Sequence, residues 1–254
     1  MQPLKPRFFL KGFAVCCPEP AVLQPFEVVS VDVDRTLLPA SLRRRASLTT
    51  QMAVTAASAA CEKAGVEPRE LPSVFASVGG EIRVTDELCR ALPDREQSLS
   101  PTRFHNSVHN TTAGYWGILH ECRSPAVAIA ALEDTFAIGL LETCLQLLEQ
   151  PGQLLLVCYD EFWPQYLAPP MGSIAFSCAF VLASGQSDSG LSTISMPFVG
   201  SEERCFDRQL EEMIRSAPVS ACISLIKALD QPQRAGRVPL SPGPKCWYTD
   251  LDSR

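Results

Sequence analysis

The stretch that decides the fold is residues 100–149, SPTRFHNSVHNTTAGYWGILHECRSPAVAIAALEDTFAIGLLETCLQLLE. Residues 107–119 predict a helix with small residues in its middle, residues 126–132 form a short apolar strand, and residues 134–149 predict a second helix. A buried strand that turns sharply into a helix fixes the residue at the turn in an exposed position, as in nucleophile elbows. The residue at this turn is Glu133, so the turn carries an acid and no nucleophile.

This stretch resembles the N-terminal half of a β-ketoacyl synthase of the thiolase-like superfamily. The matching residues are SPTRFHNSVHNTTAGYWGI, the strand PAVAIAA, and the elbow with its long helix. Within that superfamily the chain is similar to short chain-length-factor partners of aryl polyene and type II polyketide ketosynthases. The resemblance covers roughly residues 7–185.

The resemblance implies that this chain has no condensation activity of its own. The family's acyl-accepting cysteine falls on Glu133, and a carboxylate cannot replace a thiolate as acyl acceptor in the usual way. A full condensing enzyme contains two such halves, and the half that carries the two catalytic histidines is missing here. The implied role is a non-catalytic subunit of a heterodimer with a full-length β-ketoacyl synthase, which acts on acyl carrier protein thioesters. No cofactor is implied.

Composition excludes several other classes of protein. The net charge of −6 argues against nucleic-acid binding, which needs a basic surface to neutralise phosphates. The longest uncharged run, residues 162–187, contains three prolines and several serines and does not predict a membrane span. The eleven cysteines are scattered without a CxxC pair, and we interpret them as small buried hydrophobic residues. A cytoplasmic protein is expected.

Apolar runs and helical segments alternate along the chain and predict an α/β fold with a mixed sheet and helices on both faces. This agrees with about one half, the N-terminal half, of a condensing enzyme. Residues 7–15, 71–78, 153–158 and 173–183 predict strands, and residues 27–33 predict an edge strand or extended segment. Residues 41–64, 84–92 and 202–229 predict helices, the last with a break at Pro218. We expect one domain, residues 1–254, with a core over about 7–230 and a Pro-rich tail at 231–254.

Two sets of residues are candidates for contacts with other proteins. Val108, Thr112 and Trp116 are spaced by four, which predicts a shared helix face. With His109 they are the candidates for the acyl tunnel and the subunit interface, a role that the resemblance implies for residues 105–119. Arg43, Arg44 and Arg45 form the densest basic run and are candidates for docking an acidic carrier protein; a solvated helix face is the simpler interpretation.

Two other functions stay open. Asp32 and Asp34 follow an apolar run in a DxDxT pattern, which is typical of Mg²⁺-dependent haloacid-dehalogenase phosphatases, with Asp160-Glu161 as the candidate second acidic site. Arg35 stands where that motif usually has a small residue. A free-standing, homodimeric acyl-binding scaffold is the other alternative. Apart from that phosphatase hypothesis, no metal site is predicted.

Overall fold

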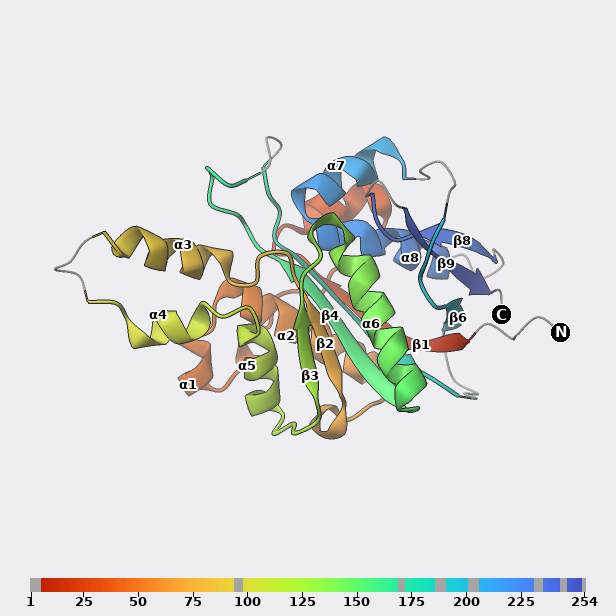
Figure 1. Cartoon of the computed structure of the whole chain (residues 1–254), viewed down its shortest axis with the longest axis horizontal. Coiled ribbons are helices and arrows are strands. Elements are labelled where there is room, and N and C mark those ends of the chain that lie inside the picture. Colours follow the sequence, from red (N-terminus) through yellow and green to blue (C-terminus); the bar gives the residue numbers. More distant parts are fainter. Residues whose placement is uncertain are drawn as a thin grey trace.

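The computed structural model describes residues 6–93, 98–168, 172–185, 191–200, 206–230, 235–242 and 246–252. In these ranges one mixed sheet has the strand order β3-β2-β4-β5-β1-β6-β9-β7, and β8 pairs with β9 (Figure 1). The strands are β1 Arg7–Cys16, β2 Ser73–Ala76, β3 Ala126–Ile129, β4 Gln153–Asp160, β5 Phe176–Ala183, β6 Ser192–Ser195, β7 Phe198–Val199, β8 Gly236–Pro239 and β9 Trp247–Asp252. The α-helices are α1 Ala40–Arg43, α2 Leu48–Ala64, α3 Ile82–Ala91, α4 Pro101–Asn106, α5 Thr111–Leu119, α6 Thr135–Glu149, α7 Arg208–Ser216 and α8 Cys222–Leu229.

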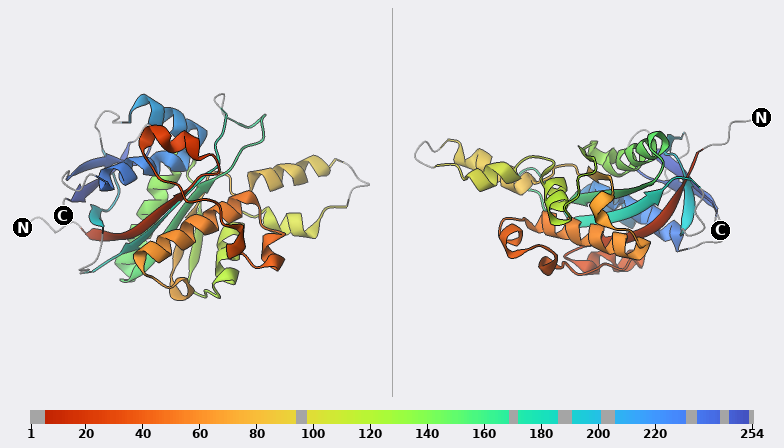
Figure 2. Two further views of the ribbon diagram at one scale, coloured as in Figure 1. Left: turned by 180° about the vertical axis from the view of Figure 1, so that it is seen from behind. Right: turned by 90° about the horizontal axis from the view of Figure 1, so that it is seen from below.

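Helices cover both faces of the sheet, which confirms the predicted mixed α/β architecture (Figure 2). α2 and α5 pack on one face, and α6, α7 and α8 pack on the other. Strand β2 pairs with β3 and β4 in parallel, whereas the pairs from β4 through β5, β1 and β6 to β9 are antiparallel. The carboxyl ends of β2, β3 and β4 therefore meet at one edge of the sheet, where loops gather functional residues in α/β folds.

A bulge in β1 changes which of its side chains point to each face of the sheet. The register against β5 shifts between Leu10 and Gly12. Before the shift Phe8 and Leu10 enter the core under α6, and after it Ala14 and Cys16 enter the core under α2, although all four positions are even-numbered. One extra residue in an alternating strand exchanges its two faces, which explains the change.

Gly12 also allows α2 to lie very close to the sheet. A Cβ atom at this position would lie 2.8 Å from the backbone oxygen of Ala60 and 2.8 Å from the backbone nitrogen of Ala64. Both contacts are to backbone atoms, which cannot rotate away. The alanine-rich sequence of α2 fits this close approach.

The predicted long helix over 41–64 is wrong in one respect, because the structure divides it. α1 ends at Arg43, and a turn leads to Ser47, whose Oγ accepts a hydrogen bond from the Thr50 backbone N–H at 3.0 Å. That serine is the N-cap of α2, and Gly65, with φ 64°, ends the helix. A local capping signal therefore interrupts a sequence whose composition favours a continuous helix.

Of the two alternatives predicted for residues 27–33, the structure has no edge strand, and a single bridge joins Val31 to Cys16. The prediction for the tail is corrected. The Pro-rich tail does not lie outside the core, because β8 and β9 belong to the sheet and Val238, Leu240 and Leu251 are buried in the main cluster.

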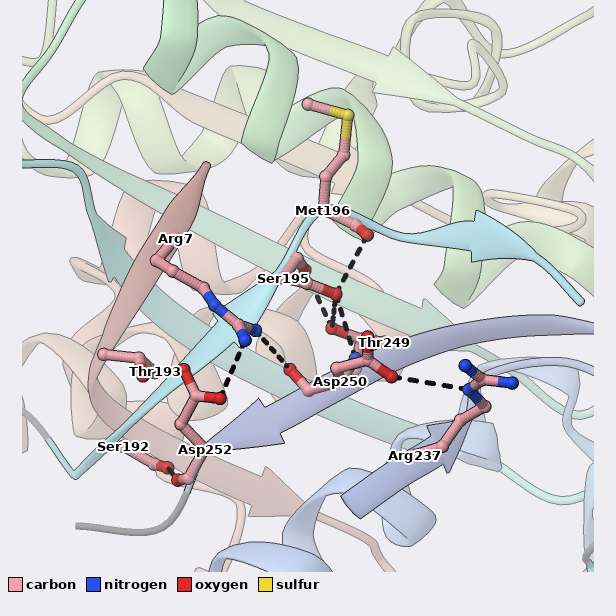
Figure 3. A network of polar contacts seen from close by, with 9 residues as sticks. All are labelled: Arg7, Ser192, Thr193, Ser195, Met196, Arg237, Thr249, Asp250 and Asp252. Carbon is pink, nitrogen blue, oxygen red and sulfur yellow. Dashed lines mark hydrogen bonds and ion pairs between the residues drawn. The ribbon is translucent and has the colours of Figure 1, made fainter. Parts of the chain in front are cut away.

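Polar contacts fix the C-terminal strand against the first one (Figure 3). Arg7 donates to a carboxylate oxygen of Asp252 at 2.8 Å and to the backbone oxygen of Asp250 at 3.2 Å. Ser195 and Thr249 exchange further bonds across β6 and β9, where Thr249 Oγ1 donates to the Ser195 backbone oxygen at 2.8 Å. The first strand, β1, and the last strand, β9, are thus joined by residues more than 240 positions apart.

Helices α3 and α4 form an arm that extends away from the sheet (Figures 1 and 2). No residue of α3 is buried, and α3 packs mainly on α4. The arm carries exposed apolar side chains, with Leu92 63 % and Phe104 66 % exposed. Apolar groups on an extension of this kind are typical of a surface that meets another protein.

Candidate functional site

The turn between β3 and α6 is a sharp elbow, as the sequence predicted. Leu132 has φ 51°, a left-handed conformation that is strained for a side chain other than glycine. The hydroxyl of Thr135 fixes the turn: Oγ1 donates to the Leu132 backbone oxygen at 2.7 Å and accepts from the Ala131 N–H at 3.1 Å. Strained backbone of this type persists where the surrounding structure holds it, often at functional sites.

Glu133 lies in this elbow, within a short 3-10 turn, Leu132–Asp134, that leads into α6. Its side chain is exposed, so the elbow presents a carboxylate to its surroundings. The nearest downstream thiol, Cys144, is completely buried, and burial raises its pKa, which leaves it as the unreactive thiol. Neither residue offers a thiolate at the elbow.

An apolar cleft of about 580 Å³ opens beside the elbow. Its walls come from the end of β2, the elbow, the loop after β4, the end of α7 with the turn that follows, and the loop after β8. Charged groups in the wall are Glu133 and Arg215, and Arg215 makes a long ion pair of 4.0 Å with Glu211. The lining residues are Val78, Leu132, Glu133, Trp163, Leu167, Ile214, Arg215, Ser216, Pro218 and Pro242.

The four candidates for the tunnel and interface separate into two pairs. Thr112 and Trp116 are 0 % and 1 % exposed on α5, which packs on α2, and the Thr112 hydroxyl lies 3.1 Å from that of Thr50. They therefore lie in the core of this chain, and their contact with an acyl tunnel or a partner subunit stays a prediction. Val108 is 47 % exposed but precedes α5, which begins at Thr111, so it does not share their helical face. His109 is half-buried, with Nε2 2.9 Å from the Ser77 backbone oxygen.

The three arginines lie together at the surface but not in the first turns of a long helix. Arg43 ends α1, and Arg44 and Arg45 form the turn after it. The Asn106 side chain donates to the Arg45 backbone oxygen at 2.7 Å, which joins this turn to the end of α4. Cations at a helix C-terminus interact favourably with the helix dipole, so Arg43 is stabilised by its own helix.

The sequence did not identify a group of buried acids at the root of the arm. Glu81, Asp160 and Glu161 are 2 %, 2 % and 7 % exposed. Asp160 accepts from the backbone N–H groups of Val78 at 3.0 Å and Val219 at 3.3 Å, and burial raises its pKa to about 7. Glu161 is held by Thr49 and by the Arg83 backbone N–H. The signal in the sequence was the Asp-Glu pair after the strand, which we had assigned to a phosphatase site.

The geometry gives that phosphatase hypothesis no support. Asp32 and Asp34 are exposed and do not follow a strand of the sheet. The Asp34 carboxylate accepts from Thr36, whose backbone N–H and hydroxyl donate at 2.8 and 2.6 Å and lower the Asp34 pKa. Among the described residues, no three His, Cys, Asp or Glu side chains are grouped so that they could hold a metal ion. A helix that could span a membrane is likewise absent from the ranges that the structure describes.

The layered sheet, the strand-to-helix elbow and the cleft beside it define the fold of about one half of a thiolase-like condensing enzyme. The family model for the β-ketoacyl synthase N-terminal domain matches residues 20–238, and the chain belongs to that family. A comparison with curated proteins finds no match.

Solved structures with the same fold include chains from three complexes. One is the ketosynthase ApeO with its chain length factor ApeC from Xenorhabdus doucetiae, at 17 % identity and TM-score 0.70, covering 96 % of this chain and 98 % of that one. The ishigamide ketosynthase/chain length factor matches at 12 % identity and TM-score 0.69, with the same two coverages. The AntDE:AntF complex of a type II polyketide ketosynthase with its acyl carrier protein matches at 10 % identity and TM-score 0.70, covering 99 % and 100 %. At these identities the likeness establishes the fold.

Proposed function

We propose that this chain is a non-catalytic subunit of the chain-length-factor type, which pairs with an active β-ketoacyl-ACP synthase and helps to shape its acyl tunnel. The observation that carries the proposal is an elbow that keeps its strained geometry but presents Glu133 in place of a thiol. Such an elbow retains the architecture for subunit contacts while it cannot form an acyl thioester. The partner subunit supplies acyl transfer and decarboxylative condensation, in a fatty-acid or polyketide-like pathway such as aryl polyene synthesis in the cytoplasm.

Strand β3 offers the surface for that partner. In the described part of the chain it is hydrogen-bonded on one side only, to β2. Ser73 N–H donates to Pro125 O and Ser77 N–H donates to Ile129 O, so the odd-numbered residues of this segment face β2. The backbone groups of Ala126 and Ala128 then point away from the sheet, where another strand can pair with them.

Exposed apolar side chains surround this open edge. Ile118 at the end of α5 is 62 % exposed, and Leu132, just after the strand, is 74 % exposed. A chain that keeps such groups in contact with water gains free energy when a partner covers them. Val108 and Phe104 continue the apolar surface along the arm, and we propose that this end of the 105–119 segment, with His109, meets the acyl tunnel.

Arg43, Arg44 and Arg45 remain the proposed contact for an acidic carrier protein. All three are exposed, and the turn that carries them is anchored to α4 through Asn106. Charges on a fixed turn guide association mainly through long-range attraction, so carrier binding should weaken with rising salt.

The test is co-expression with a full-length, cysteine-bearing β-ketoacyl synthase encoded beside this chain. We expect equimolar co-elution. Ala128→Pro removes an N–H that faces the partner and leaves the bonds to β2 intact, so it should abolish co-elution while the chain stays folded. Ala128→Ser keeps that N–H and is the matched control. Separate elution, with a synthase that is fully active alone, would contradict the proposal.

A second function is favoured by the cleft, namely a homodimeric acyl-binding scaffold. An apolar cleft of about 580 Å³ lies in the size range of small-molecule sites. Light scattering of the purified chain gives its mass, and a fluorescent fatty acid reports binding. Leu167→Glu, in the cleft wall and 44 % exposed, should weaken binding, whereas Leu145→Glu on α6, 45 % exposed and outside the cleft, should not. Equal effects of the two variants would contradict acyl binding in the cleft.

A further inference from the structure

Two buried carboxyl groups, Glu81 and Glu161, hold the root of the α3–α4 arm. Glu81 immediately precedes α3, and Glu161 immediately follows β4. Oε1 of Glu161 accepts a hydrogen bond from the Arg83 backbone N–H at 3.0 Å. The first turn of a helix has unsatisfied N–H groups, and here one of them is satisfied by a side chain from a strand of the sheet. The arm is therefore attached to the body of the protein through an acid.

Hydroxyl groups at the start of α2 satisfy most of the remaining carboxyl oxygens. Oε1 of Glu81 accepts from Ser47 Oγ at 2.6 Å and from Thr50 Oγ1 at 2.7 Å. Oε2 of Glu161 accepts from Thr49 Oγ1 at 2.8 Å. Oε2 of Glu81 is buried and has no hydrogen-bond partner among the described residues. A proton can therefore bind to Oε2 of Glu81 without breaking an existing hydrogen bond.

The surroundings disfavour two negative charges at this place. Burial, with a smaller contribution from the charge of Glu81, raises the pKa of Glu161 to about 7, against the opposing effects of its hydrogen bonds and of the Arg83 charge. Burial also raises the pKa of Glu81. Two interacting carboxyl groups away from water titrate as a pair, and the second ionisation is the costly one. The other titratable or charged groups around the pair are Arg45, Arg83, His109, Tyr115, Tyr159 and Asp160.

A second attachment of the arm is exposed to solvent. The Tyr166 hydroxyl donates to Asp86, Asp86 pairs with Arg90 at 2.9 Å, and the Arg90 guanidinium lies 5.1 Å from the centre of the Tyr166 ring. Tyr166 belongs to the loop that lines the elbow cleft through Trp163 and Leu167. Exposed pairs of this type contribute little to stability, so the buried acids dominate the attachment of the first turn.

We propose that Glu81 and Glu161 form a proton-linked hinge. With one of the two carboxyl groups protonated they hold the first turn of α3 against the body; when this proton leaves to solvent, the two like charges repel and the turn opens. The hinge is a property of this chain alone, but its consequence for assembly, weaker pairing at high pH through a loosened arm, rests on the proposed function.

Hydrogen–deuterium exchange of the purified full chain tests the hinge, with exchange times scaled for the intrinsic pH dependence of amide exchange. Protection of residues 81–85 should fall on the order of tenfold between pH 6 and pH 8, because one linked proton changes an opening equilibrium by at most about tenfold per pH unit. A flat profile over residues 81–85 in the wild-type chain would overturn the hinge.

Glutamine variants show whether Glu81 and Glu161, and not other acids, cause the pH dependence of exchange. Glu81→Gln resembles the protonated acid and removes the repulsion, so it should clearly reduce the slope for residues 81–85, whereas Glu87→Gln, exposed on the same helix, should keep the wild-type slope. If Glu81→Gln does not fold, Glu161→Gln replaces it with the same expectation. Co-elution with the synthase is measured in parallel: a hinge seen by exchange without any co-elution rejects the proposed function and keeps the hinge. A slope as steep as that of the wild-type chain in the folded glutamine variant rejects the hinge and leaves the proposed function intact.

Discussion

Strands β3 and β4 flank β2 in the same parallel direction, yet their surroundings differ. Val74 of β2 lies between Val127 on one side and Leu156 on the other. Leu156 is completely buried, whereas every residue of β3 is partly or largely exposed. The two strands have similarly apolar sequences, so the sequence alone does not separate them. What differs is that β4 has β5 as its next neighbour, and no described strand covers the outer edge of β3.

The difference continues at the carboxyl ends of the two strands. β4 ends in Asp160 and leads to Glu161, both buried and hydrogen-bonded within the chain. β3 ends in an elbow where Leu132 and Glu133 are exposed. On the β4 side of β2 the sheet is thus covered within this protein, and on the β3 side it ends in an exposed edge that resembles half of an interface. Acids on the covered side stabilise the chain's own fold, and groups on the open side are available to a partner.

The largest effect is expected from matched truncations on the two sides of Val74. Leu156→Ala should lower the free energy of unfolding by about 2–5 kcal/mol, because it leaves a cavity in a closed core. Val127→Ala should cost roughly 1 kcal/mol or less in the isolated chain, since its side chain is only partly buried. Urea unfolding of both variants measures the two values. Equal losses would show that β3 is as well covered as β4.

The acids at the end of β4 should make the stability depend on pH. Burial raises the pKa of Asp160 and of Glu161 to about 7, so the folded state binds more protons than the unfolded state between about pH 4.5 and 7. Stability is then highest at the acid end of this window and falls by a few kcal/mol as the pH rises through 7. Unfolding in urea at pH 5, 6, 7 and 8 measures the slope.

Asp160→Asn is the control for that slope. It should reduce the slope to the part that Glu161 contributes. An amide in place of the carboxylate also lowers the stability itself, because one of its two backbone donors loses an acceptor. Stability that rises from pH 5 to pH 8 would contradict the assignment.

The smallest effect is expected at the open elbow. Glu133→Ala should change the free energy of unfolding by no more than about 1 kcal/mol, the usual contribution of an exposed acid near a helix N-terminus. Product formation by the complex with the synthase should stay unchanged, as measured by product yield at equal complex concentration. A large loss of product would assign Glu133 an active role in the reaction.

The sequence predicted the strands that are long and apolar and misjudged places where a local signal interrupts a regular pattern. β4 and β5 were identified because burial on both faces requires continuous apolar runs. The helix over 41–64 was predicted as one because alanine and arginine favour helices, while Ser47 acts as a cap within it. The tail was left outside the core because prolines are rare in strands, yet its β9 contains none.

At the site, the sequence identified the elbow and Glu133 but not the cleft or the buried acids. A cleft joins segments that are distant in the chain, such as Val78, Leu167 and Pro242, and no spacing rule connects them. Glu81 follows two glycines and looks like an ordinary helix-start acid; only the fold brings it to the residues that begin α2 and to Glu161. Thr112 and Trp116 show the converse, because their helical spacing was correct but α2 covers the face they share.

The contact between Arg7 and Asp252 has a consequence for the order of folding. These residues are 245 positions apart, so the neighbourhood of β1 and β6 stays incomplete until the last strand is available. Contacts between such distant residues slow folding, because a long loop must close before they form. A growing chain would expose the edge of β6 throughout synthesis, which makes that edge the place where a chaperone or a neighbouring chain competes with β9.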